Sequence, residues 1–256
     1  MISNKLILVT NDDGIFAPGL KALVNIAKKY GEVVVVAPNS PQSGMGHAIT
    51  INQPLRIHKV QVFEGVESYE CSGTPVDCVK LAKNVLLKER TIDLCVSGIN
   101  HGSNASINII YSGTMSAAME ASLEGIPSIG FSLLDYSFDA DFDAASGHIG
   151  GLIENVLNKG LKECKLLNVN IPKLKKQEIK GVKVCCQSEG NWIEEFKEGK
   201  DPRNEIYYWL TGQFVCTDER EDTDFWALSH GYISVVPSGH DLTVYKAISQ
   251  NKFLEE

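Results

Sequence analysis

Short apolar runs rich in β-branched residues alternate with segments of helical periodicity along most of this chain. Strands are predicted at residues 5–10, 32–37, 91–96, 127–133 and 166–171. Helices are predicted between them, at residues 18–30, 74–88, 112–125 and 143–158. A strand–helix alternation of this kind predicts an α/β fold, in which a mostly parallel sheet is covered by helices on both faces.

Two stretches interrupt the alternation. Residues 49–69 predict antiparallel strands, and residues 181–217 mix short strand-like runs with aromatic and polar residues. We interpret residues 1–256 as a single α/β domain, with residues 181–217 as a projecting hairpin and the remaining C-terminal residues packed on the core or on a partner subunit. Six aromatic residues of the hairpin either mediate oligomerisation or cover the domain's own core: Trp192, Phe196, Tyr207, Tyr208, Trp209 and Phe214.

Charge and composition narrow the possible partners. The formal net charge of −8 and the absence of a long Lys/Arg run argue against stable binding to nucleic acid. No apolar stretch is long enough to span a membrane, and the N-terminus lacks a signal-peptide pattern, so we expect a cytoplasmic protein. The seven cysteines include no C-x-x-C pair, which makes a zinc site or a disulfide framework an unlikely use for them.

Polar residues directly follow three of the predicted strands. They are the segment Asn11-Asp12-Asp13-Gly14, the loop 38–44 with Ser43, and the segment 97–104 with Asn100. In a parallel sheet these strand ends meet at one edge, where ligands bind. Adjacent carboxylates repel each other in a low-dielectric setting unless a cation accompanies them, and hard oxygen ligands favour magnesium, manganese or calcium over zinc. The alternative is that Asn11 to Gly14 form only a turn, because Asn, Asp and Gly all suit turns.

The start of the third predicted helix is a candidate phosphate site. Ser112-Gly113-Thr114 offer backbone N–H groups at a helix N-terminus together with two hydroxyls, although Ser112 could equally be an ordinary N-cap. Other ligand motifs are absent: there is no G-x-G-x-x-G after the first strand, no Walker A sequence and no G-x-S-x-G elbow. The six histidines lack the spacing of a metal site.

Several strings in the sequence together resemble the SurE family of survival-protein phosphatases. They are ILVTNDDGIFAPG at 7–19, GTPVDC at 73–78, VSGINHGSN at 96–104 and YSGTMSAAME at 111–120, followed by matches at 223–224, 231–235 and 241–243. The order of the strings is that of the family, and they extend over nearly the whole chain. In the second loop the chain departs from the family pattern, because Asn39 and Gln42 stand where an Asp and an Arg are common.

The resemblance implies a Rossmann-like fold and a nucleotidase that hydrolyses nucleoside 5′- and 3′-monophosphates, in some members also short polyphosphate. It implies one divalent cation per subunit, Mg²⁺ or Mn²⁺, held by Asp12, Asp13, Ser43 and Asn100. An activated water would attack phosphorus, while Asn11, Asn100 and residues 112–114 hold the phosphate oxygens. The resemblance also implies a homodimer or homotetramer formed by exchange of C-terminal elements.

Asp12, Asp13 and Asn100 are therefore the expected catalytic residues, and Asn11, Ser112, Gly113 and Thr114 the expected substrate-binding residues. His101 is either a general acid or a solvated histidine. Two other functions stay open. One is a phosphatase that forms an aspartyl-phosphate, although such enzymes of the haloacid-dehalogenase type carry D-x-D and not adjacent acids. The other is an oligomer that binds nucleotides without hydrolysing them.

Overall fold

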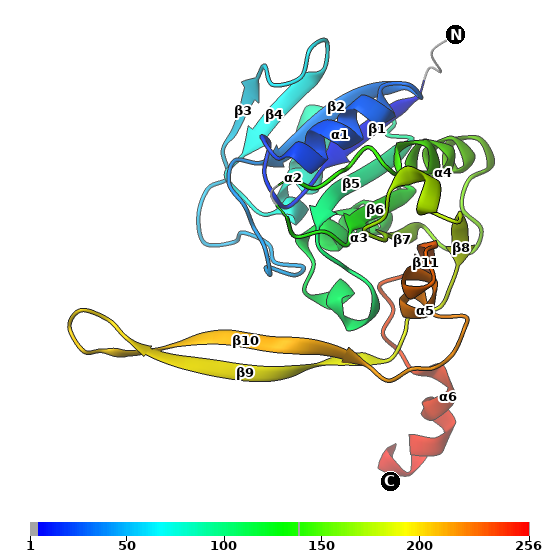
Figure 1. Cartoon of the computed structure of the whole chain (residues 1–256). Coiled ribbons are helices and arrows are strands. Elements are labelled where there is room, and N and C mark those ends of the chain that lie inside the picture. Colours follow the sequence, from blue (N-terminus) through cyan, green and yellow to red (C-terminus); the bar gives the residue numbers. More distant parts are fainter. Residues whose placement is uncertain (1–4, 138, 256) are drawn as a thin grey trace.

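A nine-stranded sheet forms the centre of the protein (Figure 1). The computed structural model describes residues 5–137 and 139–255. The strands follow one another across the sheet in the order β3–β4–β2–β1–β5–β6–β7–β11–β8. Their bounds are β1 Leu6–Thr10, β2 Glu32–Pro38, β3 Ile57–Val60, β4 Glu67–Cys71, β5 Leu94–His101, β6 Ser128–Leu133, β7 Leu166–Ile171, β8 Val182–Val184 and β11 Ile233–Ser238.

Parallel pairing dominates the sheet, as predicted. The consecutive strands β4, β2, β1, β5, β6 and β7 are all parallel, whereas β3 pairs antiparallel with β4, and β11 with β7. From β1 the chain first builds outward through β2 and later returns to add β5 on the opposite side. A crevice forms at such a reversal, beyond the carboxyl ends of the two strands, and it is the usual ligand site of an open α/β sheet.

Helices cover both faces of the sheet, which confirms the predicted fold class. On β1, Ile7 and Val9 belong to one hydrophobic cluster with residues of α1 and α4, while Leu6 and Leu8 belong to another with residues of α2 and α3. Side chains alternate between the faces of a strand, so a strand buried on both faces is apolar throughout. The helices are α1 Pro18–Ala27, α2 Pro75–Leu81, α3 Gly113–Leu123, α4 Ser146–Lys159, α5 Asp224–Ser229 and α6 Tyr245–Ile248.

The chemistry of the helix ends accounts for the two helices that precede and follow β5. Thr74 caps α2 in a reciprocal capping box with Asp77, and Pro75 occupies the first helical position. The predicted helix 74–88 is α-helical only to Leu81 and continues as a π-helical segment, Ala82–Leu86. Ser112 caps α3 by accepting a hydrogen bond from the Met115 amide.

The predicted end of the third strand was wrong. β5 extends past Val96 to His101, with a register shift against β6 between Ser97 and Asn100. Gly98 makes the irregular segment possible: its φ is +125°, and a Cβ there would lie 2.3 Å from the Phe131 carbonyl oxygen. Asn100 therefore lies near the end of a bulged strand and not in a loop.

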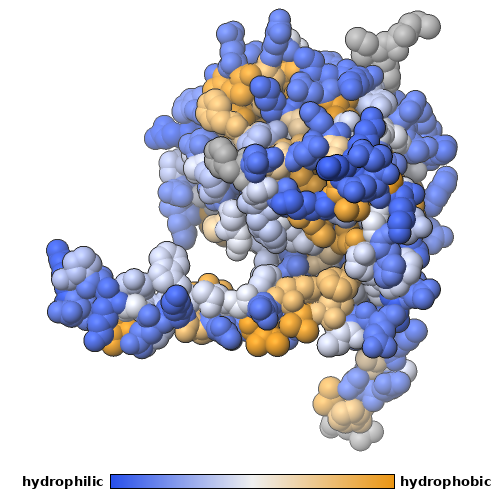
Figure 2. All heavy atoms as spheres, in the orientation of Figure 1, coloured by the Kyte–Doolittle hydropathy of each residue, from blue (hydrophilic) through white to orange (hydrophobic). Residues whose placement is uncertain are grey.

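The hairpin predicted within residues 181–217 is present as β9 Gly190–Lys200 and β10 Ile206–Cys216. We call this pair the arm; Figure 1 shows it extending away from the sheet. Phe196, Tyr207, Tyr208 and Trp209 are exposed, Trp209 to 67% and Phe196 to 64%, so these four do not cover the core of their own subunit, whereas Trp192 and Phe214 contact Asn108 and Phe225 at the root of the arm. In Figure 2 hydrophobic residues gather where the arm meets the core and again along its length.

Two further expectations concern the chain as a whole. All seven cysteines lie in the described part of the chain, where each is a free thiol. Among the described residues, no helix has the length and apolar character needed to cross a membrane.

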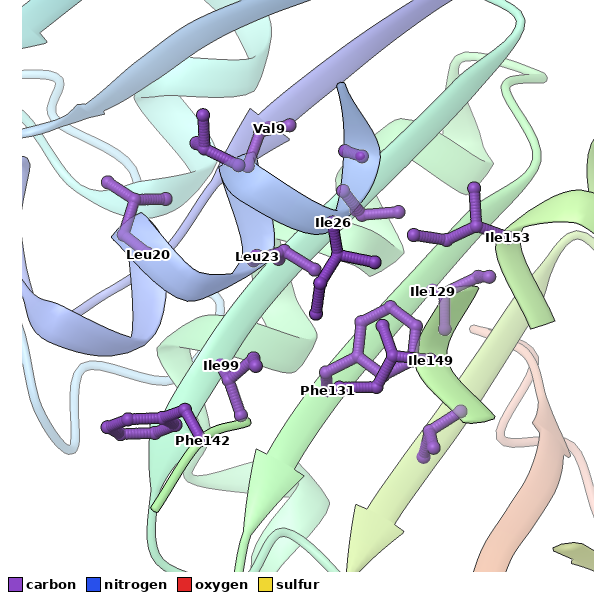
Figure 3. Packing of buried hydrophobic residues seen from close by; sticks show 14 of the residues in the cluster. Val9, Leu20, Leu23, Ile26, Ile99, Ile129, Phe131, Phe142, Ile149 and Ile153 are labelled. Carbon is purple, nitrogen blue, oxygen red and sulfur yellow. The ribbon is translucent and has the colours of Figure 1, made fainter. Parts of the chain in front are cut away.

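Among the described residues, Phe131 on β6 is the largest fully buried side chain, and in Figure 3 it lies beside Ile149 between the sheet and α4. We expect Phe131→Ala to lower the free energy of unfolding by about 3–5 kcal/mol, because a large cavity opens in a packed core. Urea unfolding followed by circular dichroism measures this loss. Phe16→Ala is the matched control: Phe16 is 74% exposed, and its change should stay within about 0.5 kcal/mol. Equal losses in both variants would contradict the assigned core.

Candidate active site

The segment Asn11 to Gly14 is a turn, and hydrogen bonds connect it to the end of the neighbouring strand β2. The Asn11 side-chain amide donates to the Gly14 carbonyl at 3.0 Å, and Gly14 adopts a φ of +98°. The Gln42 amide donates to the Asp12 carbonyl at 2.8 Å, and the Ile15 amide donates to the Pro38 carbonyl at 2.9 Å. These bonds fasten the loop after β2, which carries Ser43, to the loop after β1.

Asp12 lies buried at the N-terminus of α3, with only 4% of its surface exposed. The Thr114 hydroxyl and the Thr114 amide both donate to its carboxylate. Gly113 permits this close approach, because a Cβ there would lie 2.7 Å from the Asp12 Cβ. Burial raises the pKa of Asp12 to about 6; the Thr114 hydrogen bonds oppose the shift, and the charge of Asp13 adds to it.

Asp13 is the second acidic group of the site. Burial raises the pKa of this carboxyl as well, and the neighbouring His101 works in the opposite direction. One of its oxygens, Oδ2, is buried and has no hydrogen-bond partner among the described residues. Four of the six such side-chain oxygens in the described chain lie at the end of β1 or at its neighbour Ser97 on β5: Thr10 Oγ1, Asn11 Oδ1, Asp13 Oδ2 and Ser97 Oγ. Unpaired acceptors gathered at one place indicate a cation or another donor as the missing partner.

Residues from three strand ends line one pocket of about 520 Å³. Asp12 comes from β1, Ser43 from the loop after β2, and Asn100 and His101 from the end of β5; Ser112 lies in the same lining. The sequence-predicted residues Asp12, Ser43, Asn100 and Ser112 are thus brought together at the predicted edge of the sheet. The Asn100 amide nitrogen donates to the Gly102 carbonyl at 3.0 Å, which fixes the orientation of that side chain.

The other predicted substrate-binding groups are placed behind this lining. Asn11 is buried and caps its own turn, and the Thr114 hydroxyl is turned onto Asp12. The Ser112 hydroxyl accepts from the Met115 amide, so it serves as a helix cap. Ser112 is therefore an N-cap, and the Thr114 amide in the first turn of α3 faces the Asp12 carboxylate, while a phosphate site at this helix start stays a prediction.

Two buried acids that the sequence analysis did not single out anchor the loop carrying Ser43. Asp77 accepts hydrogen bonds from the Thr50 amide and hydroxyl, at 3.2 and 2.6 Å. The Glu120 carboxylate contacts His47 Nε2 at 2.9 Å and Lys80 Nζ at 2.5 Å. The available signal in the sequence was an acid at the third position of the α2 capping box, and another acid on α3, whose other residues are mostly small or apolar.

A buried polar network supports the segment after Asn100. The Asn104 amide donates to Asn170 at 2.8 Å, and the Asn168 side chain donates to the Asn104 carbonyl at 2.8 Å. Asn104 in turn donates to Ser132 on β6 at 2.8 Å. Two asparagines inside the fully buried strand Leu166–Ile171 were the sequence signal for this support, because buried amides need partners.

The donor set suits a hard cation. Among residues 5–137 and 139–255 no group of three or more His, Cys, Asp or Glu side chains is placed to hold a metal ion. Asp12 and Asp13 are the two acids at the end of β1, Ser43 and Asn100 add further oxygens near them, and Glu194 of the arm also lines the pocket. Such a mixed set of carboxylate, hydroxyl and amide oxygens resembles the ligands of magnesium or manganese more than those of zinc.

We expect Asp12→Asn to stabilise the protein when a chelator is present. The pKa of Asp12 is raised from 3.8 to about 6, so its contribution to stability is full below pH 3.8 and is lost as the pH rises through about 6. The loss amounts to on the order of 3 kcal/mol at neutral pH. Asparagine removes the charge but keeps an acceptor for Thr114. The melting temperature of Asp12→Asn should therefore exceed that of the unsubstituted protein at about pH 8 and approach it near pH 4.

Asp143→Asn is the matched control for this measurement, since Asp143 is exposed. Its melting temperature should follow that of the unsubstituted protein at both pH values. A lower melting temperature for Asp12→Asn than for the unsubstituted protein at alkaline pH would show that the buried charge does not destabilise the metal-free protein.

Known proteins resemble this chain in sequence and in fold. The family model described as "Survival protein SurE" matches residues 7–194. A protein of Flavobacterium psychrophilum named "5′-nucleotidase SurE" is 58% identical over 248 residues, which cover 96% of each chain. One of the same name from Christiangramia forsetii is 59% identical over 245 residues, covering 95% of this chain and 94% of the other. A crystal structure of the SurE protein from Aquifex aeolicus superposes with a TM-score of 0.84 at 41% identity, covering 98% of this chain and 100% of that one. With its sequence matched over most of its length and its fold shared, the chain belongs to the SurE family.

Proposed function

We propose that the protein is a metal-dependent nucleotidase, which hydrolyses nucleoside 5′-monophosphates to a nucleoside and phosphate. The observation that carries the proposal is the pair of adjacent carboxylates, Asp12 and Asp13, at the point where strand order reverses and beside the N-terminus of α3. The similar proteins from Flavobacterium psychrophilum and Christiangramia forsetii, both named "5′-nucleotidase SurE", support the same reaction. The 3′-monophosphates and short polyphosphate belong to the proposal as further substrates, on the strength of the family resemblance alone.

The residues present fit one divalent cation per subunit. Two carboxyls with raised pKa values and an unpaired Asp13 oxygen are the features that a cation would stabilise. Asp12, Asp13, Ser43 and Asn100 would hold it, and Mg²⁺ and Mn²⁺ match these oxygens. When bound, such a cation polarises a phosphoryl oxygen and acidifies water.

The chain's own groups orient the substrate and exclude other geometries. Thr114 donates to the Asp12 carboxylate through its hydroxyl and its backbone amide, so this carboxylate keeps one orientation toward the phosphate. The remaining first-turn amide of α3, at Gly113, and the Asn100 side chain are donors for phosphate oxygens as negative charge builds on them. His101 lines the pocket and packs edge-on against Phe142, with ring centroids 4.8 Å apart, a position from which it could protonate the leaving oxygen.

Two alternatives make different predictions about Asp12 and Asp13. In an aspartyl-phosphate mechanism one of them would be the nucleophile, but Asp12 is already held by Thr114 and sits at a helix N-terminus, an arrangement that suits a fixed ligand. A nucleotide-binding oligomer without activity would have no need for two buried carboxylates. Both alternatives are less well supported by the geometry than hydrolysis by water.

We expect phosphate release from adenosine 5′-monophosphate to require added Mg²⁺ or Mn²⁺. Asp12→Asn combined with Asp13→Asn should reduce the rate to below about one thousandth, because both the cation and the electrostatic stabilisation of the transition state are lost. A phosphate assay with metal and with chelator measures this. Asp141→Asn combined with Asp143→Asn, outside the pocket lining, is the matched control and should keep full activity.

Full activity in chelator would overturn the metal-dependent mechanism. Trapping of a phospho-aspartate with hydroxylamine would support the covalent alternative instead. Binding of the nucleotide by calorimetry, with metal present and no phosphate released over hours, would support the non-catalytic reading.

We also propose that the protein assembles as a homodimer or homotetramer through the arm and the C-terminal segment. Large apolar side chains stand exposed in both: Tyr208 on β10 to 60%, and Leu242 and Phe253 near the C-terminus to 87% and 65%. Exposed apolar surface of this kind is typical of subunit interfaces.

Charged substitutions on the arm should therefore shift the equilibrium from the oligomer toward smaller species. We expect Phe196→Glu with Tyr208→Glu to reduce the molar mass measured by light scattering, because burying a charge in an interface is costly. Lys197→Glu with Lys200→Glu, at neighbouring polar positions of β9, is the control. A monomeric unsubstituted protein would contradict the proposal.

A further inference from the structure

The arm contributes a large share of the pocket that holds Asp12. Beside the residues from the strand ends, the lining includes five arm residues: Trp192, Glu194, Leu210, Thr211 and Gly212. The family model ends at residue 194, so the β10 part of this lining lies beyond it. A pocket of about 520 Å³ is far larger than a phosphate group needs and falls in the range of sites for whole small molecules.

The root of the arm is fixed to the core directly upstream of Ser112. The Trp192 indole N–H donates to the Asn108 side chain at 2.8 Å, and the Ser106 hydroxyl donates to the Ser188 carbonyl at 2.8 Å. Asp224, fully buried, accepts from the amides of Ser106 and Ser188 at 2.9 and 3.0 Å. The position of Trp192 relative to the pocket is therefore set within one subunit.

Three aromatic rings line the pocket and are exposed in part. Trp192 is 36% exposed, Tyr111 is 52% exposed and Tyr136 is 76% exposed. Tyr136 is held against Gly102, where a Cβ would lie 2.2 Å from its ring. Trp192 packs edge-on against Phe214, with ring centroids 5.9 Å apart. Its indole is thus anchored by one hydrogen bond and one ring contact while it borders the pocket.

Chemistry points to a nucleobase as the occupant of this aromatic part. Every base has a flat π-face, and stacking on an aromatic side chain contributes about 1–3 kcal/mol per base. When ionised, the Glu194 carboxylate accepts hydrogen bonds and donates none. It can therefore accept from ribose hydroxyls, and it repels a second phosphate. We propose that Trp192 stacks on the base of the substrate, so that the arm of the same subunit selects nucleotides over phosphate esters that lack a base. The proposal rests on the proposed nucleotidase function and names the specificity-determining residue for it.

Kinetics on two substrates test the proposal. Trp192→Ala should raise KM for adenosine 5′-monophosphate by about tenfold, whereas KM for ribose 5-phosphate should stay within about twofold. Trp192→Phe should keep most of the affinity for the nucleotide, since a ring remains. Trp209→Ala, a second tryptophan on the arm that is absent from the pocket lining, should change neither KM. An unchanged KM for the nucleotide in Trp192→Ala, or an equal rise for both substrates, would overturn the proposal.

Fluorescence gives a second readout that does not depend on turnover. The chain has three tryptophans, so Trp209→Phe with Trp226→Phe leaves Trp192 as the only one. In chelator, adenosine 5′-monophosphate should quench its emission and ribose 5-phosphate should not. Unchanged emission at saturating nucleotide would overturn the stacking contact. If the unsubstituted protein hydrolyses neither ester but the quenching occurs, the nucleotidase function fails while base binding at Trp192 stands.

Discussion

Two neighbouring carboxylates at the end of the central strand impose the main constraint on this protein. The chain buries Asp12 beside Asp13, and burial raises the pKa of both. Thr114 and the N-terminus of α3 offset part of this cost at Asp12, and His101 offsets part of it at Asp13, while other acceptors nearby stay unpaired among the described residues. Such a local defect in an otherwise satisfied core is typical of a functional site, where stability is given up for binding.

The surrounding architecture keeps this unfavourable arrangement in place. Because β1 lies between β2 and β5, the loops that carry Ser43 and Asn100 converge on the same point. Asp77 and Glu120 hold the first of these loops, and the asparagines of β7 hold the segment that follows Asn100. Rigid elements therefore surround the site, and the arm completes its lining, so the proposed positions of the nucleoside and of the phosphate are connected through residues 106–112.

Strand positions could be predicted from the sequence because β1 and β2 are buried on both faces and read as near-continuous apolar runs, and because β6 and β7 are also rich in apolar residues, although they carry buried Ser and Asn side chains. The proximity of Asp12, Ser43 and Asn100 could be predicted because the ends of parallel strands lie at one edge of the sheet. Two features could not be predicted. The bulge that carries β5 to His101 depends on the close approach of Gly98 to Phe131. The contact of Trp192 with Asn108 joins residues 84 positions apart, across an arm whose direction local sequence does not determine.

Thermal unfolding during a titration with Mn²⁺ tests most directly whether the paired carboxylates form a cation site. A ligand that binds only the native state stabilises it by mass action, by about 2.7 kcal/mol at a hundredfold excess over Kd. The melting temperature of the unsubstituted protein should therefore rise with Mn²⁺ concentration, while that of Asp12→Asn with Asp13→Asn should stay constant. An equal rise in both proteins, or no rise in either, would contradict the assignment of Asp12 and Asp13 as the ligands of a divalent cation.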